Sequence, residues 1–336
     1  MPDAPGPNVP FPPMEAELVS ELPAGDGWRY EPKWDGFRGV LENVDGELNL
    51  WSRNERPLLR YFPELRPLGE LLAPRSALDG EIVIARDGAL DFDAMQMRLH
   101  PAESRIRRRS AEIPAEFVVF DVLLWDGEEV WREPLADRRM RVEALAGFRR
   151  SPATRDLADA RRWLERFEAL GLDGVVAKRL DAPYLPGSRE GMVKVKEHKT
   201  ADCVVVGLRW KADAREIATL LLGLYGDDGE MDYVGSCAVA ARTRDDVARR
   251  VMPLLVDAPD RRFSEPNRWG TGDLEEAALR PELVVEVRYD KVQGNRFRHG
   301  SKLIRWRDDK DPRDCTWREL RPPADPNAVG VETLFV

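Results

Sequence analysis

Four Asp-Gly pairs, each between runs of strand-forming residues, constrain the fold of this chain more than any other feature. They are Asp45-Gly46, Asp87-Gly88, Asp126-Gly127 and Asp228-Gly229. Asp-Gly suits the tight turn of a β-hairpin, because that turn needs residues that tolerate positive φ. The flanking runs are rich in apolar and β-branched residues, as in Phe117–Phe120. Antiparallel sheet is therefore the expected framework.

Two amphipathic segments interrupt the strands in the first part of the chain. Apolar residues recur at helical spacing from Leu157 to Leu170, where Gly171 supplies a stop, and residues 136–146 show a similar pattern. Beyond Ala201 strand signals dominate, in segments 203–210, 220–225, 231–238 and 283–290. We predict an α+β fold with a first domain over residues 1–200, of mixed sheets and helices, and a second over 201–336, a five-stranded β-barrel. The boundary is expected near His198–Asp202.

Composition narrows the class of protein. A length of 336 residues suits two domains. No run of 18 apolar residues occurs and the first residues do not form a signal peptide, so we expect a cytosolic chain without a membrane span. The three cysteines and three histidines are scattered, which argues against a disulfide framework or a zinc site.

Charge leaves nucleic-acid binding open. The net charge of −9 is unusual for a protein that binds DNA, but local patches decide binding. The window 286–310 holds eight Lys or Arg residues against four acids, and residues 105–109 include four arginines. Without further information, a solvated surface is the expectation for the arginine cluster.

The segment Glu31-Pro32-Lys33-Trp34-Asp35-Gly36-Phe37-Arg38 is a candidate for covalent chemistry. A lysine acts as a nucleophile only after it loses a proton, which desolvation or neighbouring cations favour. By itself this segment would indicate no more than a turn beside a solvated lysine. Its meaning depends on what accompanies it along the chain.

Several further motifs follow in order. Leu78-Asp79-Gly80-Glu81 and the run from Asp173 to Lys178 place carboxylates beside apolar strands, and Phe120-Asp121 ends another apolar run. In Lys194-Val195-Lys196 the period of two sends both ammonium groups to one strand face. The last motif runs from Arg305 to Lys310 and again spaces two arginines two residues apart.

These parts suit nucleotidyl transfer. Cations on one strand face can stabilise the charge on an α-phosphate, and carboxylates such as Glu81 and Asp173 can hold Mg²⁺. An aromatic ring can stack on a base. The sequence contains neither a P-loop nor a GxGxxG motif that opens a helix, so the two common nucleotide-binding folds are not indicated.

With these motifs in this order, the chain resembles the covalent nucleotidyltransferase superfamily. Within it, the chain is most similar to the short bacterial ATP-dependent DNA ligases, namely the ligase C type and the ligase domain of ligase D. The resemblance covers nearly the whole chain. It implies a nucleotidyltransferase domain of antiparallel sheets with flanking helices, followed by a β-barrel OB-fold domain.

The resemblance also implies roles for individual residues. Lys33 would form the lysyl-AMP, Glu31 would face the adenine edge and Phe120 would stack on adenine. Arg38 would contact the ribose, Arg53 the ribose or phosphate, and Glu81 the ribose or the metal. Asp173 would bind Mg²⁺ or Mn²⁺ with Glu81, and the cations Lys194 and Lys196 would neutralise the α-phosphate. Arg305, Arg307, Asp309 and Lys310 would help to expel pyrophosphate.

This chain departs from the family pattern at two positions. Asp173 stands where many relatives have glutamate, so metal contact there is expected to run through water. Glu55 stands where relatives often have glycine after Ser-Arg-Asn.

The implied enzyme seals 3′-OH/5′-phosphate nicks in double-stranded DNA, in DNA repair. The expected protein is a monomer in the bacterial cytoplasm, associated with the nucleoid, and a Ku-like end-binding protein is a candidate partner. An RNA ligase or mRNA-capping guanylyltransferase would use the same lysine chemistry, and a catalytically inactive module that binds nucleic acid through its OB-fold is the alternative from another class. Glu31 and the motif from Arg305 to Lys310 favour a DNA ligase.

Overall fold

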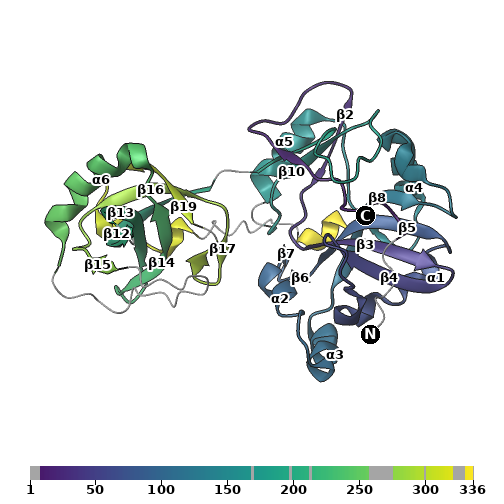
Figure 1. The fold of residues 1–336 in the computed structure, drawn as a ribbon, viewed down its shortest axis with the longest axis horizontal. Helices are drawn as coiled ribbons and strands as arrows, with labels where there is room; N and C mark the ends of the chain where they lie inside the picture. The colour runs from purple at the N-terminus through teal and green to yellow at the C-terminus, as the bar shows by residue number, and fades with distance from the viewer. Residues whose placement is uncertain are drawn as a thin grey trace. The chain divides into compact units, whose positions relative to one another are not determined.

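The computed structural model describes residues 8–167, 170–196, 199–211, 214–256, 275–298, 300–320 and 330–335. The chain divides into two compact units, shown in Figure 1. Unit 1 comprises Met1–Glu197 together with Ala324–Val336, and unit 2 comprises His198–Pro323. The division thus differs from the predicted domains 1–200 and 201–336, because the chain returns to unit 1 after Pro323. Unit 2 is an insertion within unit 1.

Unit 1 contains a five-stranded sheet in the order β4-β3-β5-β8-β9. Its strands are β3 (Phe37–Val44), β4 (Glu47–Ser52), β5 (Ser76–Val83), β8 (Glu116–Leu124) and β9 (Arg149–Arg150). All neighbours are antiparallel except the short pair β8 and β9. Successive residues of β3 point into different cores: Leu41 packs with Phe62 and Val142, whereas Val40 packs with Trp51 and Tyr184. Both faces of this sheet are therefore covered.

A four-stranded sheet completes unit 1, in the order β1-β11-β10-β2. Its strands are β1 (Glu17–Leu18), β2 (Trp28–Pro32), β10 (Val175–Arg179) and β11 (Met192–Val195). Helix α5 (Leu157–Phe167) contributes Ala160 and Phe167 to the core that this sheet shares with Tyr30 and Val175. This core also contains Val331, which explains why the segment after Pro323 belongs to unit 1.

The other elements of unit 1 are short. They are the hairpin β6 (Ala85–Arg86) and β7 (Ala89–Leu90), the helices α1 (Leu68–Leu71), α2 (Phe92–Gln96), α3 (Glu103–Glu112) and α4 (Leu135–Ala144), and the 3₁₀ helices η1 (Leu59–Tyr61), η2 (Pro63–Leu65), η3 (Val130–Arg132) and η9 (Val331–Leu334). No helix in the described ranges is long and apolar enough to cross a membrane.

Unit 2 is a closed barrel. Its strands are β12 (Lys199–Lys211), β13 (Ala214–Tyr225), β14 (Met231–Ala238), β16 (Val284–Tyr289) and β19 (Ser301–Trp306), with β15 (Glu276–Ala278) added beside β12. The order β13-β14-β19-β16-β12 closes through the pairing of β12 with β13. Helix α6 (Arg244–Val251) follows the third barrel strand. A five-stranded barrel with this strand order and helix position is an OB-fold, as predicted.

The remaining elements of unit 2 are the hairpin β17 (Val292–Gln293) and β18 (Arg296–Phe297), and the 3₁₀ helices η4 (Ala241–Thr243), η5 (Met252–Leu254), η7 (Pro312–Asp314) and η8 (Trp317–Glu319). The barrel core includes all three cysteines, Cys203, Cys237 and Cys315, as buried free thiols.

Three of the four Asp-Gly pairs lie between β-strands, as predicted, whereas Asp126-Gly127 follows β8 and is followed by η3. Asp45-Gly46, Asp87-Gly88 and Asp126-Gly127 each have positive φ at both residues, which is the geometry of a two-residue hairpin turn. Asp228-Gly229 lies in a longer turn between β13 and β14, where only the glycine has positive φ. The predicted helices and barrel strands also occur, with ends that shift by a few residues.

Candidate active site

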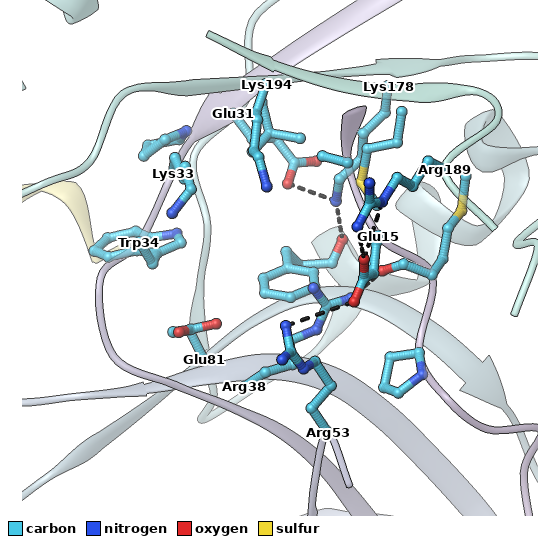
Figure 2. Close-up of a pocket in the computed structure, with 17 residues that line it drawn as sticks. Glu15, Glu31, Lys33, Trp34, Arg38, Arg53, Glu81, Lys178, Arg189 and Lys194 are labelled. Atoms are coloured by element: carbon cyan, nitrogen blue, oxygen red, sulfur yellow. Dashed lines mark hydrogen bonds and ion pairs between the residues drawn. The ribbon is translucent and has the colours of Figure 1, made fainter. Parts of the chain in front are cut away.

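A cavity of about 380 Å³ opens in unit 1 between its two larger sheets. Figure 2 shows the residues that line it, which come from the segment before β1, from strands β2, β3, β5, β8, β10 and β11, and from the loops after β2, after β4 and before β11. They include most of the predicted site residues of this unit: Glu31, Lys33, Arg38, Arg53, Glu81, Phe120 and Lys194. The volume lies within the range of small-molecule sites.

Lys33 directly follows β2 and is fixed by its backbone. Its N–H donates to the carbonyl of Gly174 at 2.9 Å, and its own carbonyl accepts from the N–H of Asp173 at 2.9 Å. The side-chain Nζ donates to Oδ2 of Asp173 at 2.6 Å. Lys196 Nζ lies 2.9 Å from the same oxygen. The nucleophile candidate is therefore held at both backbone and side chain by the start of the Asp173–Lys178 motif.

The three lysines and Asp173 form one electrostatic group. Burial raises the pKa of Asp173, but attraction to Lys33 and Lys196 outweighs burial and lowers it overall. Burial and repulsion from the other two ammonium groups lower the pKa of Lys194. Val193 and Val195 pack in the core, so the two lysines that alternate with them lie on the other face of this strand and its end. The period of two in the sequence produces this placement.

Two motif glycines are required by close backbone approach. A Cβ atom on Gly36 would lie 2.0 Å from the carbonyl oxygen of Ile82 in β5. At Gly174, where φ is +122°, it would lie 2.1 Å from the carbonyl oxygen of Val195. No side chain fits at either distance. Unlike the hairpin pairs described above, Asp35-Gly36 and Asp173-Gly174 are therefore points of close strand contact. They bring together the segments that carry Lys33, Glu81 and Lys194.

Glu81 lies on β5 and faces the same cavity. Its Oε1 accepts from the N–H of Gly36 at 3.2 Å. Burial raises the pKa of Glu81 to about 7, although Arg38 and Lys33 act in the opposite direction. The neighbouring cations do not fully compensate for the burial of Glu81. A bound cation would therefore stabilise its ionised form.

We expect Glu81→Gln to remove a pH dependence of stability. The folded pKa of about 7 lies above the value of about 4.3 in an unfolded chain. The folded protein therefore keeps a proton that the unfolded chain loses, and the free energy of unfolding falls as pH rises from about 4.3 to 7. Urea unfolding is measured at pH 5, 6, 7 and 8. Between the first and the last pH, the free energy of unfolding should fall by on the order of 2 kcal/mol more for wild type than for the variant. Glu47→Gln, on an exposed side chain of β4, is the matched control, and parallel curves for wild type and Glu81→Gln would contradict the expectation.

The carboxylates suit a metal ion only together with a nucleotide. Among the residues that the structure describes, no group of three or more His, Cys, Asp or Glu side chains is placed to hold a metal. Asp173 is already neutralised by Lys33 and Lys196, whereas Glu81 lines the cavity. Such a donor set fits Mg²⁺, which often uses one or two carboxylates, substrate phosphates and retained waters.

Arg38 is held by a buried carboxylate that the sequence interpretation did not assign. Asp79 is fully buried and accepts from Arg38 Nε at 2.6 Å and Nη2 at 2.5 Å. The hydroxyl of Tyr184 donates to Asp79 at 2.7 Å. Asp79 lies two residues before Glu81 on β5, so the period of two was a signal for it. Tyr184 lies outside the strands and carried no such signal.

Two cations lie close to the ring of Phe120 at the cavity wall. The guanidinium carbon of Arg38 and the Nζ of Lys178 are each 4.6 Å from the ring centroid. Lys178 Nζ also donates to Oε2 of Glu31 at 2.8 Å, and Arg139 Nη1 is 3.5 Å from Oε1. Glu31 is only 2% exposed. Both residues proposed to contact adenine thus share Lys178 as a neighbour, and this lysine is buried.

Arg53 lies at the rim of the cavity and is 62% exposed at its side chain. Its Nη1 is 3.5 Å from Oε1 of Glu15, whose Oε2 is 3.1 Å from Arg189. Glu15 precedes the first strand and was not identified from the sequence. Close to Arg53, Glu55 adopts a φ of +58°. The left-handed conformation explains why glycine is favoured at this position of the motif.

We expect Glu55→Gly to stabilise the protein by about 0.5 kcal/mol. The left-handed conformation costs a non-glycine residue roughly 1–2 kcal/mol, and the greater freedom of glycine in the unfolded chain offsets part of the gain. Urea unfolding measures the difference. Arg56→Gly, at an exposed neighbour outside the left-handed region, should have the opposite sign. Destabilisation by both substitutions would show that Glu55 is not strained.

The last predicted motif lies in unit 2, and its charges pair within that unit. Arg305, which is 57% exposed, donates to Glu286 at 2.6 Å. Arg307 donates to Asp202 at 2.6 Å and, through Nε, to Asp309 at 2.9 Å. Lys310 donates to the same oxygen of Asp202 at 3.0 Å. Hydrogen bonding from Arg307 lowers the pKa of Asp309 to about 2.

The four arginines of residues 105–109 lie on α3, and three of them pair with acids of the same helix. Arg107 is within 2.5 Å of Glu103, and Arg108 and Arg109 are within 3.6 Å of Glu112. Ile106 is the buried residue of this helix. These pairs agree with the solvated surface that was expected.

Comparison with known proteins agrees with the motif order and the fold. Residues 13–196 match the family model described as ATP dependent DNA ligase domain, and residues 213–310 match ATP dependent DNA ligase C terminal region. DNA ligase C2 of Mycolicibacterium smegmatis is 44% identical, over 95% of this chain and 97% of that protein. The multifunctional non-homologous end joining protein LigD of Pseudomonas aeruginosa is 33% identical over 93% of this chain and 37% of its own length.

A solved structure of a Lig E DNA ligase has the same fold. It covers 88% of this chain and 100% of that chain, with a TM-score of 0.53 and 16% sequence identity. The match of the first family model covers more than half of the chain, and the ligase C2 relative covers almost all of it. The chain therefore belongs to the ATP-dependent DNA ligases.

Proposed function

We propose that this ligase stores AMP on Lys33 and uses the cavity of unit 1 for all of its chemical steps. The observation that carries the proposal is the position of the Lys33 ammonium group. It lies beside the cavity with Asp173, Lys194 and Lys196 around it. A cavity with a fixed amine, neighbouring cations and an aromatic wall suits a nucleoside triphosphate.

In the first step the deprotonated Nζ of Lys33 attacks the α-phosphorus of ATP. A P–N bond forms, the bond to the bridging oxygen breaks, and pyrophosphate leaves. Lys194 and Lys196 stabilise the negative charge that spreads over the α-phosphate oxygens. Asp173, whose pKa is lowered, stays ionised and orients Lys33 and Lys196 rather than accepting a proton. Arg305, Arg307, Asp309 and Lys310 assist the departure of pyrophosphate.

Two transfers to DNA follow. An oxygen of the 5′-phosphate attacks the phosphorus of the lysyl-AMP, the P–N bond breaks and Lys33 regains a proton. The 3′-hydroxyl then attacks the activated 5′-phosphate, loses its proton, and AMP leaves. Each transfer is an in-line displacement in which positioning and charge stabilisation supply most of the catalysis.

The base and sugar would be held by other residues that line the cavity. Phe120 would stack on adenine, with Glu31 at the base edge. Arg38, fixed by Asp79, would contact the ribose, and Arg53 at the rim would contact the ribose or a phosphate. A bound Mg²⁺ or Mn²⁺ would supply positive charge to the phosphate oxygens, held by Glu81 and, through water, by Asp173.

The biological setting that we propose is DNA repair. The name of the LigD relative refers to non-homologous end joining, which supports recruitment to DNA ends by a Ku-like protein. We propose that the enzyme is a monomer. We also propose that it acts in the cytoplasm, at the nucleoid, since its substrate is nicked double-stranded DNA.

Labelling with α-³²P-ATP tests this function directly. Incubation with Mg²⁺ or Mn²⁺ should place label on the protein, and addition of nicked duplex DNA should discharge it into a sealed strand. Labelling with α-³²P-GTP, or discharge only to nicked RNA, would favour a capping or RNA-joining enzyme instead. An unlabelled protein that still binds DNA would indicate an inactive binding module.

A further inference from the structure

The segment that returns to unit 1 contacts the residue next to the nucleophile. Figure 2 shows Trp34 beside Lys33 at the same end of the cavity. The ring of Phe335 stacks on Trp34, with centroids 5.6 Å apart and planes at 24°. Phe335 lies outside both segments that the family models match. None of the motifs identified in the sequence includes it.

The segment is anchored independently of this stacking. Val331 is fully buried in the core of the four-stranded sheet, and its N–H donates to the carbonyl of Gly88 at 2.8 Å. Leu334 packs against the same core, and the guanidinium of Arg149 lies 5.8 Å from the ring centroid of Phe335. The segment that carries Phe335 is therefore held in place by contacts other than those with Trp34. This allows Phe335 to support Trp34 in the cavity wall.

Trp34 belongs to the buried core of the four-stranded sheet, and two specific side-chain contacts further hold its indole. Its Nε1 donates to the Ser151 hydroxyl at 2.9 Å, and Phe335 covers its ring. The indole is 5% exposed although it lines the cavity, so its position determines the space beside Lys33. A hydrogen bond at Nε1 fixes one point of the indole but leaves rotation about that point. The stacked ring restricts that rotation.

We propose that Phe335 is a positioning residue for the first step: it fixes the indole of Trp34 and thereby the approach of Lys33 to the α-phosphorus. The inference rests on the proposed role of Lys33. In-line attack depends steeply on geometry, so loss of the support lowers the rate of covalent loading rather than the affinity for ATP. Sealing of a nick that already carries AMP does not use Lys33 as nucleophile and is unaffected.

The test compares Phe335→Ala with Phe335→Trp, which keeps an aromatic ring, and with Glu332→Ala at an exposed side chain of the same segment. Single-turnover adenylation is measured against ATP concentration, alongside sealing of pre-adenylated nicked DNA and the thermal midpoint. Phe335→Ala should adenylate about tenfold more slowly, equivalent to about 1.4 kcal/mol, with the same half-saturating ATP concentration. Phe335→Trp should recover to within about twofold, and Glu332→Ala should match wild type.

The alternatives separate cleanly. Adenylation by Phe335→Ala at the wild-type rate would overturn the inference, and so would an equal loss of adenylation and sealing. If Phe335→Ala is too unstable to assay, Phe335→Leu keeps apolar contact without the ring, and wild-type adenylation by that variant also overturns it. Lys33→Arg is run in parallel: label on that variant would refute the proposed function, whereas the Phe335 variants are judged only against wild type.

Discussion

Replacing Lys33 with arginine should abolish the covalent AMP adduct, with a loss in adenylation rate of at least about 1000-fold. A guanidinium group stays protonated at any pH that the protein tolerates, so it cannot supply the attacking lone pair. The substitution keeps the positive charge that faces Asp173, which limits its effect on folding. Labelling with α-³²P-ATP and Mg²⁺ measures the result.

Two controls make the Lys33 result specific. Lys302→Arg, at an exposed position on β19, makes the same chemical change away from the cavity and should label normally. Lys33→Arg should still seal a nick that carries AMP on its 5′-phosphate, because that step uses the 3′-hydroxyl as nucleophile. A labelled band of normal intensity from Lys33→Arg would show that another residue carries AMP.

The second large effect is expected in unit 2. The double substitution of Arg305 and Arg307 by alanine should slow self-adenylation by about 100-fold, because these side chains are proposed to orient the departing pyrophosphate. The same variant should seal pre-adenylated nicks at close to the normal rate. Both rates are measured on one preparation, with Arg318→Ala, at an exposed arginine of the same unit, as the control.

Substitution of Arg305 tests this role with less effect on stability than substitution of Arg307. Arg305 is more exposed and pairs with Glu286, whereas Arg307 pairs with Asp202 and Asp309. Loss of Arg307 leaves the buried Asp202 with fewer partners and lowers stability. The single variant Arg305→Ala should therefore keep the thermal midpoint of wild type and retain the selective defect. Equal loss of adenylation and sealing would assign these arginines to folding or to DNA contact.

Local sequence signals predicted those parts of the fold that depend on neighbouring residues. Asp45-Gly46 specifies its hairpin through positive φ at both positions, and Lys194 and Lys196 reach one face through the period of a strand. Unit 2 begins at His198, and Lys199–Cys203 already belong to β12 and pair with β16.

Partners that are distant in sequence could not be predicted in the same way. Tyr184 meets Asp79 across 105 residues, and Lys178 meets Glu31 across 147 residues. These contacts depend on how the two sheets pack, which no local pattern specifies. The family resemblance supplied roles for Arg38 and Glu31, but the buried charges that hold them became visible only in the folded chain.

The insertion of unit 2 into unit 1 has a consequence for biosynthesis. Domains generally fold as they emerge from the ribosome, beginning with the N-terminal part. Lys33 and all the strands that line the cavity precede residue 197, so they leave the ribosome before the barrel. Phe335 emerges only after the barrel has been translated. A nascent chain can therefore assemble the nucleotide cavity early, but it acquires full capacity for covalent loading only once both units have been made.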